Sequence, residues 1–197
     1  VGGGIPIIRP LNTSITADEV TEITGILNGT TNYILTKMDQ EGASYDEVLK
    51  QAQDLGYAER NPEADVEGGD ACRKIAILTS IVYGKHLDYT KIHTEGITKI
   101  STEDFKYADA LGVSIKLVGT TKKEGDTLYS FVAPMMLDEN HPLSGIHDVF
   151  NGIFVHGNVV DDIMFYGRGA GKLPTASAVV SDVVDEVKHM GKNIMAS

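Results

Sequence analysis

The stretch VSIKLVGTTKKEGDTLYSFVAPM, residues 113–135, decides the fold class of this chain. In residues 113–120 and 127–135, apolar and polar side chains alternate, which is the period of a β-strand with one buried face. The charged segment KKEGD at 122–126 lies between the two runs, so the stretch predicts a β-hairpin. Further strands are expected in three segments rich in β-branched and aromatic residues: 20–26, 152–155 and 163–166.

The rest of the chain predicts helices, most of them ahead of this hairpin. Helices are expected in five segments with apolar residues at helical spacing, at about 30–41, 44–55, 70–83, 101–111 and 175–190. A glycine follows each of the first four segments, as is typical of a helix C-terminus. Helices early and strands later predict an α+β fold, with a mostly antiparallel sheet covered by helices on one face. No linker divides the chain, so residues 1–197 are expected to form one domain.

The composition restricts the class of protein. The 197 residues are 42% hydrophobic and 23% charged, which is typical of a globular domain. The net charge of -11 repels phosphate backbones, so we expect no nucleic-acid partner. No run of ~18 apolar residues occurs, so we expect no membrane partner and no membrane-spanning segment. The single cysteine, Cys72, has no partner for an intrachain disulfide, which indicates a reducing, cytoplasmic compartment.

Ionisable side chains gather in residues 56–74, GYAERNPEADVEGGDACRK. Glu59 and Asp65 lie in a predicted loop, whereas Asp70 and Lys74 share one face of the following helix. Because that helix is otherwise mostly apolar, burial and neighbouring carboxylates would act in opposite directions on the protonation of the lysine. This balance suits a group that both donates and accepts a proton. The same spacing also fits an ordinary solvated Asp–Lys pair, and spacing alone leaves both alternatives open.

A second candidate segment, GRGAGKLPTAS at 167–177, precedes the last predicted helix. Glycines allow backbone N–H groups to face an anion, and a helix N-terminus adds positive potential. Leu173 follows Lys172 where a Walker loop needs Ser or Thr, and the dinucleotide fingerprint G-x-G-x-x-G is absent. An ordinary turn before a helix is an equal alternative.

The six histidines match no zinc spacing, and Cys72 is more typical of a packed thiol than of a nucleophile.

Taken together, these segments resemble the homoserine dehydrogenase family, specifically its substrate-binding and dimerisation region. The matching strings occur in the family's order along the chain: GGGIPII at 2–8, GILNGTTNYI at 25–34, GYAE at 56–59 followed by Asp70 and Lys74, HPL at 141–143, and GRGAG at 167–171 followed by PTAS at 174–177. A series of this length is specific. It therefore favours the catalytic interpretation of Asp70 and Lys74 over the ordinary ion pair.

The resemblance implies an oxidoreductase of threonine, methionine and isoleucine biosynthesis. Enzymes of this family interconvert L-homoserine and L-aspartate 4-semialdehyde with NAD or NADP as the cofactor. The resemblance implies that Lys74 is the acid/base residue and that Glu59 and Asp70 bind the amino group of the substrate, supported by Asp65. It also implies a homodimer.

The resemblance further implies a cofactor site and a sodium site. Gly56, Glu59 and Gly169 are expected near the nicotinamide. The backbone carbonyls of Val1, Gly3 and Ile5 are expected to line the sodium site, because a hard cation prefers oxygen ligands.

The Rossmann-type nucleotide-binding domain that precedes this region in the family has no counterpart in the sequence. We therefore expect a fragment that turns over negligibly and binds NADP poorly by itself, and whose preference between NAD and NADP is set elsewhere. Apolar surface near its ends is expected to favour self-association. Two alternatives stay open: a dimerisation or ligand-binding module without catalysis, and a lysine-dependent lyase or isomerase that needs no nicotinamide.

Overall fold

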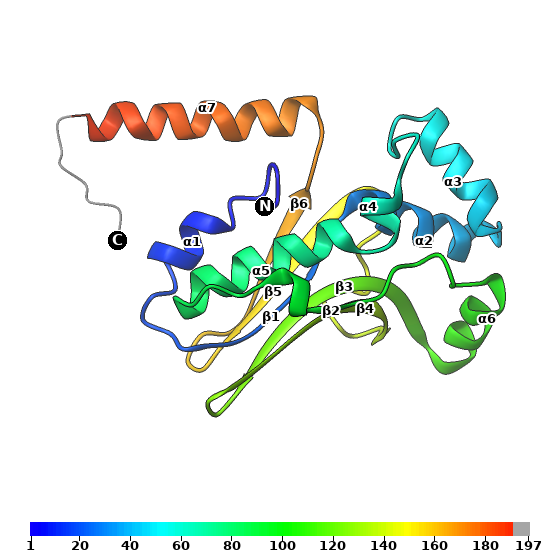
Figure 1. The fold of residues 1–197 in the computed structure, drawn as a ribbon, viewed down its shortest axis with the longest axis horizontal. Coiled ribbons are helices and arrows are strands. Elements are labelled where there is room, and N and C mark those ends of the chain that lie inside the picture. The colour runs from blue at the N-terminus through cyan, green and yellow to red at the C-terminus, as the bar shows by residue number, and fades with distance from the viewer. Residues whose placement is uncertain (191–197) are drawn as a thin grey trace.

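The structure is a computed structural model that describes residues 1–190. It consists of one sheet with helices packed on it (Figure 1). The elements in chain order are α1 (Ile8–Thr13), β1 (Val20–Ile26), α2 (Gly29–Glu41), α3 (Tyr45–Asp54), α4 (Glu63–Val66), α5 (Gly69–Tyr83), the 3-10 helix η1 (Tyr89–Lys91), β2 (His93–Thr94), α6 (Thr102–Leu111), β3 (Val113–Glu124), β4 (Thr127–Asp138), β5 (Phe150–Gly157), β6 (Asp161–Arg168) and α7 (Lys172–His189).

The sheet has six strands in the order β2-β4-β3-β1-β5-β6. The short pairing of β2 with β4 is parallel, and the other four pairings are antiparallel. Strands β3 and β4 form the predicted hairpin, and its turn places Gly125 at φ +59°, a left-handed conformation that suits glycine. Strand β1 lies between this hairpin and the β5–β6 hairpin. The predicted α+β class and the mostly antiparallel sheet are confirmed.

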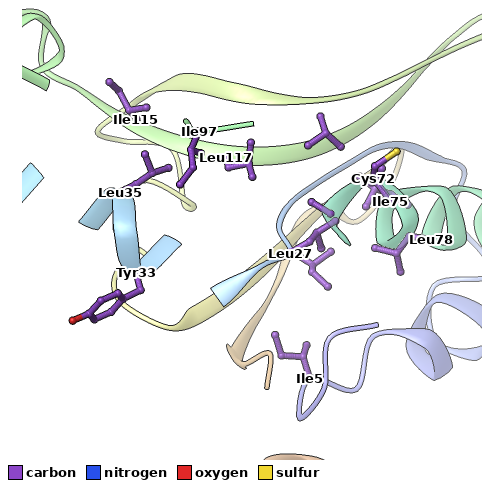
Figure 2. Packing of buried hydrophobic residues seen from close by; sticks show 14 of the residues in the cluster. Ile5, Leu27, Tyr33, Leu35, Cys72, Ile75, Leu78, Ile97, Ile115 and Leu117 are labelled. Carbon is purple, nitrogen blue, oxygen red and sulfur yellow. The ribbon is translucent and has the colours of Figure 1, made fainter. Parts of the chain in front are cut away.

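Helices α2, α5 and α6 cover one face of the sheet, as predicted. Figure 2 shows the core between the helices and the sheet, where Leu117 of β3 and Ile75 of α5 are among the buried side chains. Gly119 of β3 lies where α5 crosses the sheet, and a Cβ atom there would be 3.1 Å from the Cβ of Ile75 and 3.2 Å from Leu27. A side chain larger than hydrogen at this position would therefore push the helix away from the sheet.

The opposite face of the sheet carries a smaller cluster of buried side chains. Neighbouring residues of a strand point to opposite faces, so Val118 and Phe154 point away from the helices and pack beneath the segment 139–149. Beyond this cluster the same face presents exposed large side chains from β4 and β6: Tyr129 (51%), Met135 (36%), Met164 (42%) and Tyr166 (54%). We name these four residues the open sheet patch.

Helix α7 runs beside the rest of the molecule rather than into its core (Figure 1). Its apolar side chains are exposed, for example Val180 at 60% and Val183 at 58%. Ion pairs from Arg9 to Asp182 (3.4 Å) and to Asp185 (3.1 Å) connect it to α1. None of the helices in residues 1–190 is both long and apolar enough to cross a membrane.

Some predicted boundaries are wrong, and four short elements were not predicted. Helix α7 begins at Lys172 rather than near Thr175, and β3 to β6 extend beyond the predicted segments because their polar ends remain paired in the sheet. The elements α1, α4, η1 and β2 have six, four, three and two residues, which is too short for a periodic pattern.

Candidate active site

Three ionisable residues of segment 56–74, Asp65, Asp70 and Lys74, contact the chain where β1 ends and α2 begins. Strand β1 ends at Ile26, and Asn28 caps the N-terminus of α2 by accepting a hydrogen bond from the backbone N–H of Thr31 at 2.9 Å. Helix α4 and the first turn of α5 lie against this junction. The local sequence explains the break, because an extended Asn followed by Gly-Thr-Thr is a typical helix start.

Lys74 points to the end of β1. Its Nζ donates to Oδ2 of Asp70 at 2.6 Å and to the carbonyl oxygen of Leu27 at 2.9 Å. The side chains of Lys74 and Asp70 are 25% and 32% exposed, so both are partly covered and both can be reached by a small molecule. An ammonium group has three N–H donors, so these two bonds leave one donor for a ligand.

Asp65 and Asp70 are connected through Asn28. The Nδ2 of Asn28 donates to Oδ1 of Asp65 at 2.8 Å and to Oδ2 of Asp70 at 2.9 Å. Since Lys74 binds the same Oδ2, these four residues form one hydrogen-bonded cluster, which we call the Asn28 cluster. Two carboxylates beside an ammonium are suited to a small ligand that carries an amino group and a hydroxyl group.

The sequence did not identify Asn28 as a site residue. It lies 37 and 42 positions from its two carboxylate partners, so spacing gave no signal for these contacts. The available signal was local: a polar residue stands between a buried strand and a helix.

Glu59 and Gly56 lie on the loop between α3 and α4, and both are exposed. The carbonyl of Glu59 accepts from Nε2 of Gln53 at 3.0 Å. Within residues 1–190, no hydrogen bond or ion pair joins the Glu59 side chain to Asp70 or Lys74. The structure therefore brings Asp65, Asp70 and Lys74 together but leaves Glu59 on the loop beside them.

This loop is attached to α2. The hydroxyl of Thr30 donates to the carbonyl of Tyr57 at 2.6 Å, and the rings of Tyr57 and Tyr33 make an edge contact with centroids 5.1 Å apart. The N-terminal end of α2 thus contacts the loop of Glu59 through Thr30 and the two aspartates through the capping residue Asn28.

The two glycine-rich segments of the sequence approach each other. A Cβ atom on Gly3, whose φ is +54°, would lie 2.1 Å from the carbonyl oxygen of Gly169. A Cβ atom on Gly169 would lie 2.2 Å from Nδ2 of Asn151. Glycine is required at Gly3 because backbone approaches backbone there, and at Gly169 because the Asn151 side chain fills the place of a Cβ. The segment expected to bind sodium therefore contacts the loop expected near the cofactor.

The carbonyl oxygens of the N-terminal segment are of the type that a hard cation prefers. The carbonyl of Ile5 accepts one hydrogen bond, from the N–H of Ile7 at 2.9 Å, and a carbonyl oxygen has two lone pairs. Among residues 1–190, no group of three or more His, Cys, Asp or Glu side chains is arranged to hold a metal.

A buried lysine lies on the other face of the sheet. Lys116 of β3 is 2% exposed and its Nζ donates to the carbonyl of Ile146 at 2.6 Å. Burial lowers the pKa of Lys116 to about 8, although Asp39 and Asp148 act in the opposite direction. Since residues 115 and 117 face the helices, Lys116 points away from the Asn28 cluster and belongs to a separate environment.

Cys72 has the packed environment expected of a structural thiol. It is buried in α5, and its Sγ donates to the carbonyl of Tyr89 at 3.4 Å. The thiol therefore faces η1 and takes no part in the Asn28 cluster.

Comparisons with known proteins identify the family and the fold of the chain. The family model described as "Homoserine dehydrogenase" matches residues 6–184. The homoserine dehydrogenase of Bacillus subtilis is 47% identical over 190 residues, which cover 96% of this chain and 44% of that protein. The crystal structure of a homoserine dehydrogenase from Thiobacillus denitrificans superposes with a TM-score of 0.94 at 41% identity, covering 98% of this chain and 45% of that one.

A hyperthermophilic archaeal homoserine dehydrogenase, solved in complex with NADPH, also has this fold. It superposes with a TM-score of 0.81 at 27% identity, covering 96% of this chain and 54% of that one. The chain thus spans less than half the length of the Bacillus subtilis relative and about half of this structure. The match of the family model over most of the chain shows that it belongs to the homoserine dehydrogenase family.

Proposed function

We propose that this chain supplies the substrate-binding and acid/base part of an NAD(P)-dependent enzyme that interconverts L-homoserine and L-aspartate 4-semialdehyde. The observation that carries the proposal is the position of the Lys74 ammonium, held between the Asp70 carboxylate and the Leu27 carbonyl at the end of β1. The family membership of the chain supports the reaction, and the threonine, methionine and isoleucine pathways follow from the reaction.

Lys74 is proposed to move the hydroxyl proton. Oxidation of a primary alcohol to an aldehyde removes a proton from oxygen and a hydride from carbon. When its Nζ is unprotonated, Lys74 accepts the proton from the homoserine hydroxyl, and in the reverse direction it returns that proton to the aldehyde oxygen. A bound nicotinamide takes up or supplies the hydride.

Asp70 and Asp65 are proposed to bind the substrate ammonium, and Glu59 to join them from its loop. Carboxylates form charge-assisted hydrogen bonds with a primary ammonium, and these bonds orient the hydroxyl toward Lys74. The exposed position of Glu59 allows it to turn toward a ligand that enters between the loop and the Asn28 cluster.

The nicotinamide is proposed to lie near Gly56, Glu59 and Gly169. Gly169 has no side chain of its own to obstruct a flat ring, and the Asn151 side chain packs against it on one side. The NADPH complex of the archaeal relative supports a nicotinamide cofactor for this family, while the choice between NAD and NADP stays open.

A sodium ion is proposed at the carbonyls of Val1, Gly3 and Ile5, supported by the oxygen donor set of that segment.

A homodimer is proposed to form through the open sheet patch. This patch places Tyr129, Met135, Met164 and Tyr166 on one side of the sheet, opposite the helices. Sedimentation of the wild type and of Met164→Glu tests the proposal, with Tyr107→Glu on the opposite, helical side as the control. We expect a dimer for the wild type and the control and a monomer for Met164→Glu; a monomeric wild type would contradict the proposed dimer.

A cytoplasmic location is proposed on the basis of the single cysteine.

The function is tested by replacing Lys74 in the full-length gene product. Lys74→Met should lower kcat for homoserine oxidation by roughly 10²- to 10⁴-fold, the usual contribution of a general acid/base, with little change in the KM for homoserine. Lys37→Met is the matched control, because Lys37 also pairs with an acid at i+4, Glu41 at 3.4 Å, but on α2 away from the cluster.

Three outcomes separate the alternatives. Turnover by Lys74→Met at the wild-type rate would remove Lys74 from the reaction. Homoserine binding without any turnover by the wild type would indicate a ligand-binding module. Conversion of homoserine without a nicotinamide cofactor would indicate a lyase or isomerase. For the 197 residues alone, we propose negligible activity, which a steady NADP-dependent oxidation by that purified chain would contradict.

A further inference from the structure

The side chain of Asn28 uses all of its polar atoms in four hydrogen bonds. It is 6% exposed. Its Oδ1 accepts from the N–H of Thr31 at 2.9 Å and from the Thr31 hydroxyl at 3.2 Å. Its Nδ2 donates to Asp65 at 2.8 Å and to Asp70 at 2.9 Å. A buried amide with two acceptor contacts and two donor contacts has a single favourable orientation.

The two donor contacts connect different elements. Asp65 lies in α4, which has only four residues, and Asp70 lies in the first turn of α5. Both carboxylates lie within 2.9 Å of the same nitrogen atom, so they are close neighbours and repel each other when both are charged. The Lys74 ammonium, 2.6 Å from Asp70, opposes this repulsion. The hydrogen bonds from Asn28 to both carboxylates and the positive N-terminal ends of α2 and α5 act in the same direction.

Helix capping does not account for the amide nitrogen. A cap needs only an acceptor oxygen, and Ser44 and Ser101 cap α3 and α6 with hydroxyl groups. At the start of α2, Ser would cap about as well as Asn. The NH2 group of Asn28 therefore serves the two aspartates rather than the helix.

We propose that Asn28 is a positioning residue that fixes the spacing of Asp65 and Asp70, so that the pair forms a socket for the primary ammonium of the substrate. The inference rests on the proposed function, because that function supplies the ammonium. Asn28 acts through the two aspartates and does not itself exchange a proton. Lys74 keeps its second anchor, the Leu27 carbonyl, whether or not the amide is present.

The test compares Asn28→Ser and Asn28→Asp with the wild type in the full-length gene product. Both variants keep an oxygen that can cap α2; Ser removes the two donors, and Asp replaces them with a third acid. The loss of two hydrogen bonds to charged groups should raise the KM for homoserine by roughly 10- to 100-fold with a smaller change in kcat. Asn28→Asp should raise the KM for homoserine further. The KM for the nicotinamide cofactor should stay the same.

The split between KM and kcat separates positioning from a purely structural role. In Asn28→Ser the KM for homoserine should rise by a larger factor than kcat falls, because the two aspartates lose the donor that holds them together. Ser44→Ala is the control for a lost cap: it should lower the melting temperature while KM and kcat stay at wild-type values.

A measurement without turnover keeps the inference separate from the proposed function. Calorimetry of homoserine binding without cofactor should give a higher dissociation constant for Asn28→Ser than for the wild type. An unchanged dissociation constant together with an unchanged KM would overturn the positioning role, even if Lys74→Met is inactive. A higher dissociation constant in a protein that does not oxidise homoserine would instead retain the role of Asn28 and refute the proposed function.

Discussion

The buried cation Lys116 predicts a specific dependence of stability on pH. Its pKa is lowered from the ordinary 10.5 to about 8 in the folded protein, because the side chain is buried. Below pH 8 the native state must hold a charged ammonium in this position. Between pH 8 and 10.5 the native lysine loses its proton while the unfolded chain retains it. The unfolded state then binds more protons, so the free energy of unfolding rises with pH over this interval.

The magnitude follows from the same values. Each pH unit corresponds to 1.36 kcal/mol, so the interval from about 8 to 10.5 is worth about 3 kcal/mol. Lys116→Met removes the charge and keeps a similar side-chain volume. At pH 7 the variant no longer holds a charged ammonium in a buried position, which favours its folded state. It also loses the hydrogen bond to Ile146, which for a charged donor is worth about 1.5–3 kcal/mol. Near neutral pH the two proteins should therefore be similarly stable, and near pH 10.5 the wild type should be more stable.

Urea unfolding at several pH values between 7 and 10.5 measures the difference between the wild type and Lys116→Met. Other titrating groups are common to both proteins and cancel in this difference. Lys122→Met, at the exposed end of β3, is the control for loss of one lysine, and its difference from the wild type should not vary with pH. A difference for Lys116→Met that stays constant across the interval would refute the reasoning.

Three other predictions concern contacts elsewhere in the fold. Tyr83→Phe should raise the free energy of unfolding by about 1 kcal/mol, because the Tyr83 hydroxyl is buried without a partner in residues 1–190, whereas Tyr33→Phe, which removes a hydrogen-bonded hydroxyl, should lower it. Gly119→Ala should cost about 1–3 kcal/mol in thermal or urea unfolding, because its methyl group would lie 3.1 Å from a side-chain carbon of α5. NMR titration of His156 should show a midpoint above that of an ordinary histidine, since a hydrogen bond to Asp162 raises the pKa of His156, and Asp162→Asn should lower that midpoint.

The sequence predicted the parts of the fold whose signals are local. Strand β1 (Val20–Ile26) followed from its β-branched residues, which are five of the seven in VTEITGI. The β3–β4 hairpin followed from alternation around a polar turn. Helix α1, IRPLNT, was missed because six residues with an internal proline carry no helical period.

The candidate site likewise contains one contact that the sequence predicted and others that it did not. The contact between Asp70 and Lys74 follows from their spacing on one helix. The contacts of Asn28 depend on how α2 packs beside α4 and α5, which no local pattern specifies. Lys116 was missed for a related reason. In an alternating strand it has the place of a solvent-facing residue, but a distant segment covers that face of the sheet.

The central position of β1 in the sheet has a consequence for the order in which the protein forms. Gly25 of β1 lies opposite Gly119 on one side and opposite Ile153 on the other, so this early strand pairs only with late parts of the chain. During synthesis β1 leaves the ribosome before both of its partner strands and stays unpaired until β3 has been made. Each hairpin closes quickly because its strands are adjacent, whereas bringing β1 between them requires long loops to close. The Asn28 cluster begins directly after β1, so the strand that leads into it is fixed in the sheet only by strands translated after the cluster itself.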